Sequence, residues 1–172
     1  MIIGIAGGSA SGKSTLAKRL AEATGARHIS MDHYYKPYEE LPVVLGTDGV
    51  EYKDYNCPEA FFTTRLVNDL QSIREDVILE GLLILHEKKL RDLCDLRIFL
   101  DCPADVRVVR RLLRNMERGM EPKEIASVYL ALVRYRHEEY VAPSAVYADE
   151  VWETTHGVEA CYQSLLNRIT RS

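Results

Sequence analysis

The residues most clearly suited to chemistry lie near the N-terminus, where Gly7-Gly-Ser-Ala-Ser-Gly12-Lys13-Ser14 satisfies the pattern G-x-x-x-x-G-K-[ST]. Glycines let the backbone wrap a phosphate with its N–H groups, Lys13 would reach the terminal phosphates, and the Ser14 hydroxyl would ligate Mg²⁺. The alternative is a glycine turn before an ordinary helix. The predicted phosphate site, with ATP as the phosphoryl donor, comprises Gly7, Gly8, Ser9, Ala10, Ser11, Gly12, Lys13, Ser14 and Thr15.

Two carboxylates follow predicted strands. Asp32 ends the second strand and Glu80 ends the third, and open α/β sheets bind ligands at the carboxyl ends of their strands. Asp32 is the candidate base for an attacking hydroxyl, and its alternative roles are a second magnesium-shell ligand or a helix N-cap. Glu80 is the candidate Mg²⁺ ligand, directly or through water, and its alternative role is to cap a loop.

A third signal is a run of arginines on one predicted helix. Spacings of four, three and four place them on one stripe, with Arg110 beside it and Glu117 as the single acid between Val106 and Arg118. Such a face favours an external anion, although a solvated helix face is the alternative. We expect Arg111 and Arg114 to stabilise transition-state charge and Arg114 and Arg118 to bind phosphates. The stripe is Arg107, Arg111, Arg114 and Arg118, and Val109, Leu112, Leu113 and Met116 lie opposite.

Short apolar runs that alternate with helical patterns must position these groups. They predict an α/β, three-layer P-loop NTPase fold, a parallel sheet covered by helices on both faces. We expect the arginine helix to act as a lid with a hinge at 118–122, and one helix to run from Pro58 past Ile73. No strand is predicted within 33–56. The expected strands are 2–6, 27–31, 77–79, 96–100 and 150–152, and the other expected helices follow Lys13, Pro103, Pro122 and Val158.

Length and composition exclude several classes of protein. The 172 residues, 47% of them hydrophobic, suit one domain over 1–172. A net charge of -4 argues against nucleic-acid partners. Without a basic leader or an apolar run near ~18 residues, the expected location is the cytoplasm, away from membranes. The histidines lack metal-ligand spacing. Four cysteines without a C-x-x-C pair read as reduced thiols, and a homo-oligomer is left open.

Together these segments resemble the uridine kinase family, within the group that includes phosphoribulokinase and nicotinamide riboside kinase. The resemblance rests on GIAGGSASGKSTLA, MDHYYKP, YNCPEAF, VILEGLLIL, LRIFLDCPADVRVVRRLLRNMERG and VYADEVW, spread over about 150 residues. It implies that Asp32 is the catalytic base and that Lys13, Ser14 and Glu80 serve the phosphates and magnesium. It also implies that arginines 111, 114 and 118 clamp phosphates or the acceptor, and that Tyr35 and Tyr55 lie near the acceptor base.

Departures from the family pattern all concern the acceptor. Where the family usually has N-F-D-H-P-D-A-F, this chain has Asp54-Tyr-Asn56-Cys-Pro-Glu-Ala-Phe61, so Asn56 replaces the ribose-binding carboxylate. Met120 and Val128 replace an arginine and a glutamine, and 74–77 leaves no room for the family's pyrimidine-reading hairpin. The predicted acceptor residues are Tyr35, Tyr55, Asn56 and Arg111.

The leading hypothesis is therefore an ATP-dependent small-molecule kinase of uridine kinase type, with a nucleoside or related metabolite as acceptor. The alternatives are a kinase for a non-nucleoside acceptor, a nucleotide-binding regulatory module without transfer activity, and a GTP-dependent switch. A base such as Asp32 is needless in a mere binder, which disfavours the module. The absence of an N-K-x-D tetrapeptide from the sequence disfavours the switch.

Overall fold

The computed structural model describes residues 1–170, and the last two residues of the predicted domain lie outside them. Its centre is a five-stranded parallel sheet with strand order β2-β5-β1-β6-β7. The predicted strands are thereby confirmed. Their bounds are β1 Ile2–Gly7, β2 Arg27–Ser30, β5 Val77–Glu80, β6 Leu96–Asp101 and β7 Glu150–Glu153.

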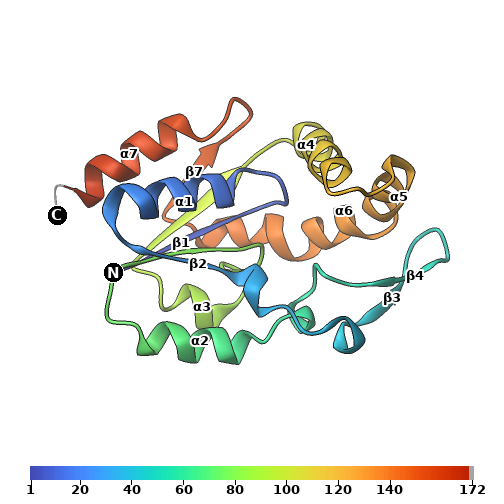
Figure 1. Cartoon of the computed structure of the whole chain (residues 1–172), viewed down its shortest axis with the longest axis horizontal. Coiled ribbons are helices and arrows are strands. Elements are labelled where there is room, and N and C mark those ends of the chain that lie inside the picture. The colour runs from blue at the N-terminus through green and yellow to red at the C-terminus, as the bar shows by residue number, and fades with distance from the viewer. Residues whose placement is uncertain (171–172) are drawn as a thin grey trace.

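Helices cover both faces of this sheet, which confirms the predicted three layers (Figure 1). On one face α1 (Lys13–Thr24) and α7 (Glu159–Ile169) pack on apolar residues that include Ile5 and Ile98. On the other face, α2 (Thr63–Ser72) and α3 (Lys88–Arg91) pack on a second core that includes Leu79 and Phe99. The central strands therefore bury both of their faces over most of their length, whereas β7 at the edge of the sheet is only partly buried.

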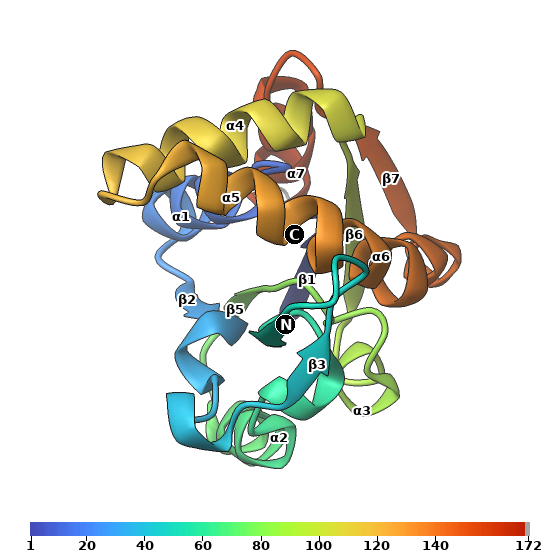
Figure 2. The same ribbon diagram turned by 90° about the vertical axis from the view of Figure 1, so that its right-hand side faces the viewer.

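The arginine helix, α4 (Ala104–Glu117), follows β6 and lies beside α5 (Pro122–Val128) (Figure 2). Gly119, at a φ of 85°, supplies the left-handed residue that ends α4. Beyond α5 the helical path continues through the π-helical turns Tyr129–Val133 and His137–Val141, with α6 (Arg134–Arg136) between them and the 3₁₀ turns 142–147 after them. The helix predicted at Pro122 is thus far longer than its sequence pattern indicated.

The stretch 33–56, predicted to hold no strand, contains an antiparallel hairpin of β3 (Val43–Leu45) and β4 (Glu51–Lys53). Short 3₁₀ turns, Met31–Tyr34 and Tyr38–Glu40, precede it. Each strand is three residues long and largely exposed. The apolar run Val43–Leu45 in β3 is shorter than the roughly four to eight residues by which buried strands are recognised. The prediction was wrong here because this hairpin is not part of the core.

The single helix predicted from Pro58 is also wrong, since Pro58–Ala60 forms a 3₁₀ turn and α2 begins only at Thr63. Phe61 between them is extended, pairs with Tyr35 in an isolated bridge and stacks on its ring at 4.3 Å. Ring stacking and the bridge outweigh the helical periodicity at this point.

Two further observations bear on the composition arguments. All four cysteines are free thiols, as expected. Within residues 1–170, no helix combines the length and apolar character that a membrane crossing requires.

Candidate active site

The glycine-rich loop joins β1 to α1 and leaves the start of α1 free to meet an anion. Gly12 is the N-cap at a φ of 102°, and neither a capping side chain nor an acid occupies the first turn. Ala10 also adopts a left-handed φ of 64°. The Lys13 ammonium is buried and donates to the Gly8 carbonyl at 2.8 Å. Unpaired N–H groups and a lysine held within the loop make a phosphate cradle.

Close packing explains why two of these positions are glycine. A Cβ at Gly8 would lie 2.7 Å from Nη1 of Arg107, and one at Gly12 would lie 2.7 Å from Val158. The loop is also anchored from the far end of the sheet, because Thr154 Oγ1 donates to the Ser11 carbonyl at 2.9 Å. The loop conformation is therefore fixed by neighbours on α4 and β7 as well as by its own sequence.

Both predicted carboxylates lie beside this loop. Ser30 pairs with Glu80 in the β2–β5 register, which brings Asp32 and Glu80 to the same edge of the sheet. Burial, and next the charge of Glu80, raise the pKa of Asp32, while Lys13 acts in the opposite direction. The N-cap of the turn Met31–Tyr34 is Ser30, whose hydroxyl accepts from the Asp32 backbone. The alternative of Asp32 as an N-cap is therefore wrong.

A metal could be held between Ser14 and Glu80. The Ser14 hydroxyl donates to Glu80 Oε1 at 3.1 Å, and Glu80 is 3% exposed. Mg²⁺ is typically bound through one or two protein oxygens together with phosphate oxygens and waters. This pair of oxygen donors beside the phosphate cradle fits that requirement.

The stripe on α4 turns toward the phosphate loop. Arg111 Nη1 and Arg114 Nη2 donate to the same hydroxyl, Ser9 Oγ, at 3.0 and 3.3 Å. The Nε atoms of both are buried without a hydrogen-bond partner, and within residues 1–170 neither guanidinium forms an ion pair. Burial and their mutual repulsion lower the pKa of Arg111, and burial followed by the charge of Arg118 lowers that of Arg114. These two arginines lack the anion that their surroundings call for.

The other arginines of α4 behave differently from one another. Arg107 is buried and donates to the Cys102 carbonyl at 2.8 Å. Arg110 donates to the backbone carbonyls of Thr154 and Thr155 after β7. Arg118 is exposed. A solvated arginine face is therefore wrong for most of the stripe and holds only at its C-terminal end.

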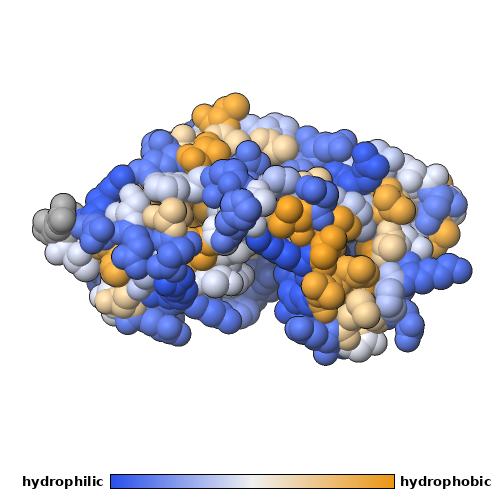
Figure 3. All heavy atoms as spheres, turned by 90° about the horizontal axis from the view of Figure 1, so that it is seen from above, coloured by the Kyte–Doolittle hydropathy of each residue, from blue (hydrophilic) through white to orange (hydrophobic). Residues whose placement is uncertain are grey.

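Apolar residues of α4 face outward instead. Val109, Leu113 and Met116 are 55%, 56% and 43% exposed, and apolar side chains gather over α4 when the molecule is seen from above (Figure 3). The helix thus places its charges inside and its apolar side chains outside, the reverse of an ordinary surface helix.

Aromatic rings lie next to the carboxylate at position 32. Tyr35 packs edge to face on Tyr55 with ring centroids 5.5 Å apart. Burial and the nearby charge of Asp32 raise the pKa of the Tyr35 hydroxyl, and Arg111 opposes that shift. Three of the predicted acceptor residues, with the candidate base, thus surround one region of the molecule.

Comparison with known proteins agrees with this geometry. A family model described as the phosphoribulokinase / uridine kinase family matches residues 50–159. A uridine kinase of Clostridium botulinum (strain Okra / Type B1) is 34% identical over an alignment of 180 residues that covers 87% of this chain and 85% of the relative. The corresponding figures for a uridine kinase of Geobacillus sp. (strain WCH70) are 32% over 182 residues, 87% and 83%. The chain belongs to the phosphoribulokinase / uridine kinase family.

These curated relatives carry the name uridine kinase, and the chain is a small-molecule kinase. A shikimate kinase from Acinetobacter baumannii, solved in complex with shikimate, superposes with a TM-score of 0.63 at 20% identity, covering 99% of this chain and 93% of that one. At that identity the likeness speaks for the fold alone.

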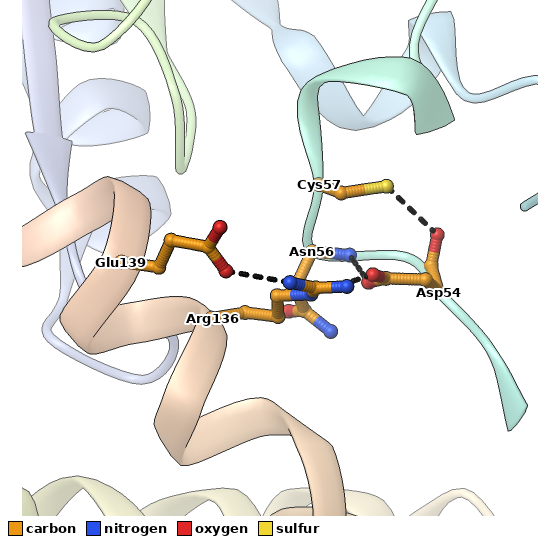
Figure 4. A network of polar contacts seen from close by, with 5 residues as sticks. All are labelled: Asp54, Asn56, Cys57, Arg136 and Glu139. Atoms are coloured by element: carbon orange, nitrogen blue, oxygen red, sulfur yellow. Dashed lines mark hydrogen bonds and ion pairs between the residues drawn. The ribbon is translucent and has the colours of Figure 1, made fainter. Parts of the chain in front are cut away.

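A buried ion pair lies beside Asn56. Asp54 is fully buried and accepts from Arg136 Nε at 2.7 Å, while Asn56 is half-exposed (Figure 4). Sequence reasoning missed both members of this ion pair. They lie 82 residues apart, Asp54 is one acid in a polar stretch, and Arg136 is one charge in a charged segment, so no spacing connects them.

Proposed function

We propose that this family member transfers the γ-phosphoryl group of ATP to a hydroxyl of a nucleoside or a related small metabolite, with residues 1–172 as one kinase domain. The observation that carries the proposal is the convergence of Arg111 and Arg114 on Ser9, across the phosphate cradle from the strand end that holds Asp32. Cations and a carboxylate base on opposite sides of a phosphate are what in-line phosphoryl transfer requires.

On the donor side, Lys13 exchanges its contact with the Gly8 carbonyl for phosphate oxygens, and the backbone from Gly7 to Thr15 receives the phosphates. Ser14 and Glu80 hold Mg²⁺, which supplies charge neutralisation when bound. Burial lowers the pKa of Lys13, and the carboxylates of Glu80 and then Asp32 oppose that shift. These two carboxylates help to keep the lysine charged.

On the acceptor side, Asp32 accepts the proton of the attacking hydroxyl. Its raised pKa makes it a stronger base than an aspartate of ordinary pKa. Arg111 and Arg114 then meet the charge that spreads over the transferring group, and their unpaired Nε atoms supply donors that no residue of the described chain engages. Arg118 assists from the exposed end of α4 as the helix closes like a lid.

The residues on the acceptor side indicate which acceptors suit the site. Tyr35 and Tyr55 offer a flat aromatic surface suited to a ring. At position 56 a carboxamide offers one acceptor oxygen and two donors instead of a carboxylate's two acceptor oxygens. Asp54 does not replace that carboxylate, because it is fully buried and its oxygens accept from the Asn56 backbone and from Arg136. We therefore expect uridine to be a poor acceptor, and a phosphorylated or carboxylated hydroxyl compound is the second candidate.

A turnover screen tests the proposal. Formation of ADP from ATP and Mg²⁺ is followed with a panel of nucleosides, sugars, phosphorylated sugars and hydroxy acids, with Asp32→Asn as the matched inactive control. The proposal requires acceptor-dependent ADP formation by the native chain and its loss in the variant. A panel that leaves ADP formation at its acceptor-free rate would contradict it.

A further inference from the structure

A buried ion pair fastens the loop before α2 to the long helical segment after α5 (Figure 4). Asp54 Oδ2 accepts from Arg136 Nε at 2.7 Å, and Asp54 is 0% exposed. The same guanidinium donates through Nη1 to Glu139 at 2.5 Å. The pKa of Arg136 is lowered by burial, but its bonds to Glu139 and Asp54 more than compensate and the net shift is upward.

Asp54 in turn determines the conformation of the loop that carries Asn56. Its Oδ1 accepts from the Asn56 backbone N–H at 2.9 Å, its own N–H donates to the Pro42 carbonyl at 2.8 Å, and its carbonyl accepts from the Cys57 thiol. Every polar group of this residue is therefore engaged in holding the loop 54–57.

The helical segment on the other side continues directly from α5, which packs beside the arginine helix and is joined to it by the turn 118–121. A second contact joins it to the hairpin, since the Thr47 N–H donates to the Ala131 carbonyl at 3.2 Å. Arg136 lies between two π-helical turns, a feature found frequently at functional sites. The hairpin, the loop 54–57 and this segment are thus connected at both ends of the hairpin.

We propose that Arg136 is an acceptor-positioning residue: through Asp54 it holds Tyr55 and Asn56 in register with the arginine helix, so that the acceptor loop and the phosphate-binding arginines move together. The inference deepens the proposed function and rests on it for the identity of the acceptor loop. If the loop is misplaced in most molecules, the apparent affinity for the acceptor falls by the fraction that remains competent, while the phosphate cradle is unaffected.

The two partners are not equivalent, which gives the test a direction. In Arg136→Gln a fully buried carboxylate loses its cationic partner, whereas in Asp54→Asn the arginine keeps Glu139 and some solvent exposure. Removing one member of a buried pair is more harmful than removing both. Arg136→Gln should therefore be the most impaired variant, and Asp54→Asn/Arg136→Gln should recover part of the loss.

Steady-state kinetics with uridine as the assayed acceptor provides the first measurement. The control is Arg134→Gln, two residues away in the same helix, whose exposed guanidinium only approaches Glu138 at 3.9 Å. We expect the KM for uridine to rise about ten-fold or more in Arg136→Gln and less in the double variant. The KM for ATP should stay within about two-fold of native in both, and the control should match the native chain. A uridine KM unchanged in both folded variants, or an equal rise in both KM values, would overturn the inference.

Amide hydrogen exchange provides a second measurement that needs no turnover and so separates this inference from the proposed function. With Mg²⁺ and a non-hydrolysable ATP analogue, amides of 46–57 in the native chain and in Arg134→Gln should exchange more slowly than without nucleotide. In the double variant this slowing should vanish from 46–57 and persist in α1. Slowing that persists in 46–57 of the double variant would refute the coupling, even if the native chain phosphorylates no acceptor in the panel.

Discussion

Replacement of Asp32 by asparagine should abolish phosphoryl transfer and at the same time stabilise the fold. Asp32 keeps solvent exposure, yet desolvation by its neighbours and the charge of Glu80 raise its pKa above the ordinary value despite Lys13, Arg114 and His33. A raised carboxyl pKa means that the charged form is less favourable in the folded chain than in the unfolded chain. The asparagine keeps the shape of the side chain without that charge.

The magnitude follows from proton linkage. Each unit of upward shift corresponds to at most about 1.4 kcal/mol of destabilisation at pH values above the folded pKa, and solvent screening of this exposed carboxylate reduces that figure. For a chain of this size, about 1 kcal/mol changes Tm by about 2 to 4 °C. The penalty is absent below the unfolded pKa of about 4 and complete above the raised folded pKa. The stabilisation by asparagine should therefore be greatest at alkaline pH and disappear on acidification.

Thermal denaturation of both proteins from pH 4 to pH 8 measures this stabilisation, and single-turnover kinetics measures the loss of transfer. Without a base, the rate should fall by about 10² to 10⁴. Titration with Mg²⁺ and ATP should give similar affinity, because Asp32 acts on the acceptor. Near-native turnover of the asparagine variant would refute the base assignment. If the asparagine variant had a lower Tm than the native chain at pH 8, the inferred destabilising effect of the Asp32 charge would be wrong.

Four other substitutions test the remaining roles. Lys13→Ala should abolish transfer and also weaken ATP binding, which calorimetry measures against Asp32→Asn. Arg111→Ala and Arg114→Ala should lower kcat more than they weaken ATP binding, since their charge is needed most in the transition state, and an unchanged kcat in both would contradict this role. Asn56→Asp should raise kcat/KM for uridine by about ten-fold, since charge-assisted hydrogen bonds contribute about 1.5 to 3 kcal/mol. Efficient uridine turnover by the native chain would contradict it.

Sequence alone predicted the parallel sheet, its helical covering and the position of the phosphate loop. These features depend on signals that are local in the chain. Examples are an apolar run such as 77–80, a glycine that ends a helix, such as Gly25 at a φ of 73°, and the spacing of the glycines around Lys13. Local sequence signals predict an element correctly when the element is buried on both sides, because burial then favours the same secondary structure as the local propensity.

The rest depends on contacts between segments distant in sequence. The hairpin β3–β4 is held by Thr47 and Asp54 against a helical segment some 80 residues later, and its own strands are only three residues long and largely exposed. The helix α2 does not extend back to Pro58, because Phe61 pairs with Tyr35 in a bridge and stacks on its ring. Partners of this kind are invisible to periodicity, so the phosphate side was predictable and much of the acceptor side was not.

The polarity of α4 links these observations to the chemistry. Its sequence gives an apolar stripe and an arginine stripe, and the hydrophobic effect by itself favours burying the apolar one. The fold does the opposite: Leu113 is 56% exposed, while the Nε atoms of Arg111 and Arg114 are buried without a partner beside Ser9. An arrangement that buries uncompensated charge and exposes apolar surface costs stability unless something binds between the arginines and the loop. A bound triphosphate supplies the missing charge, so nucleotide binding should both complete this helix and raise the stability of the chain.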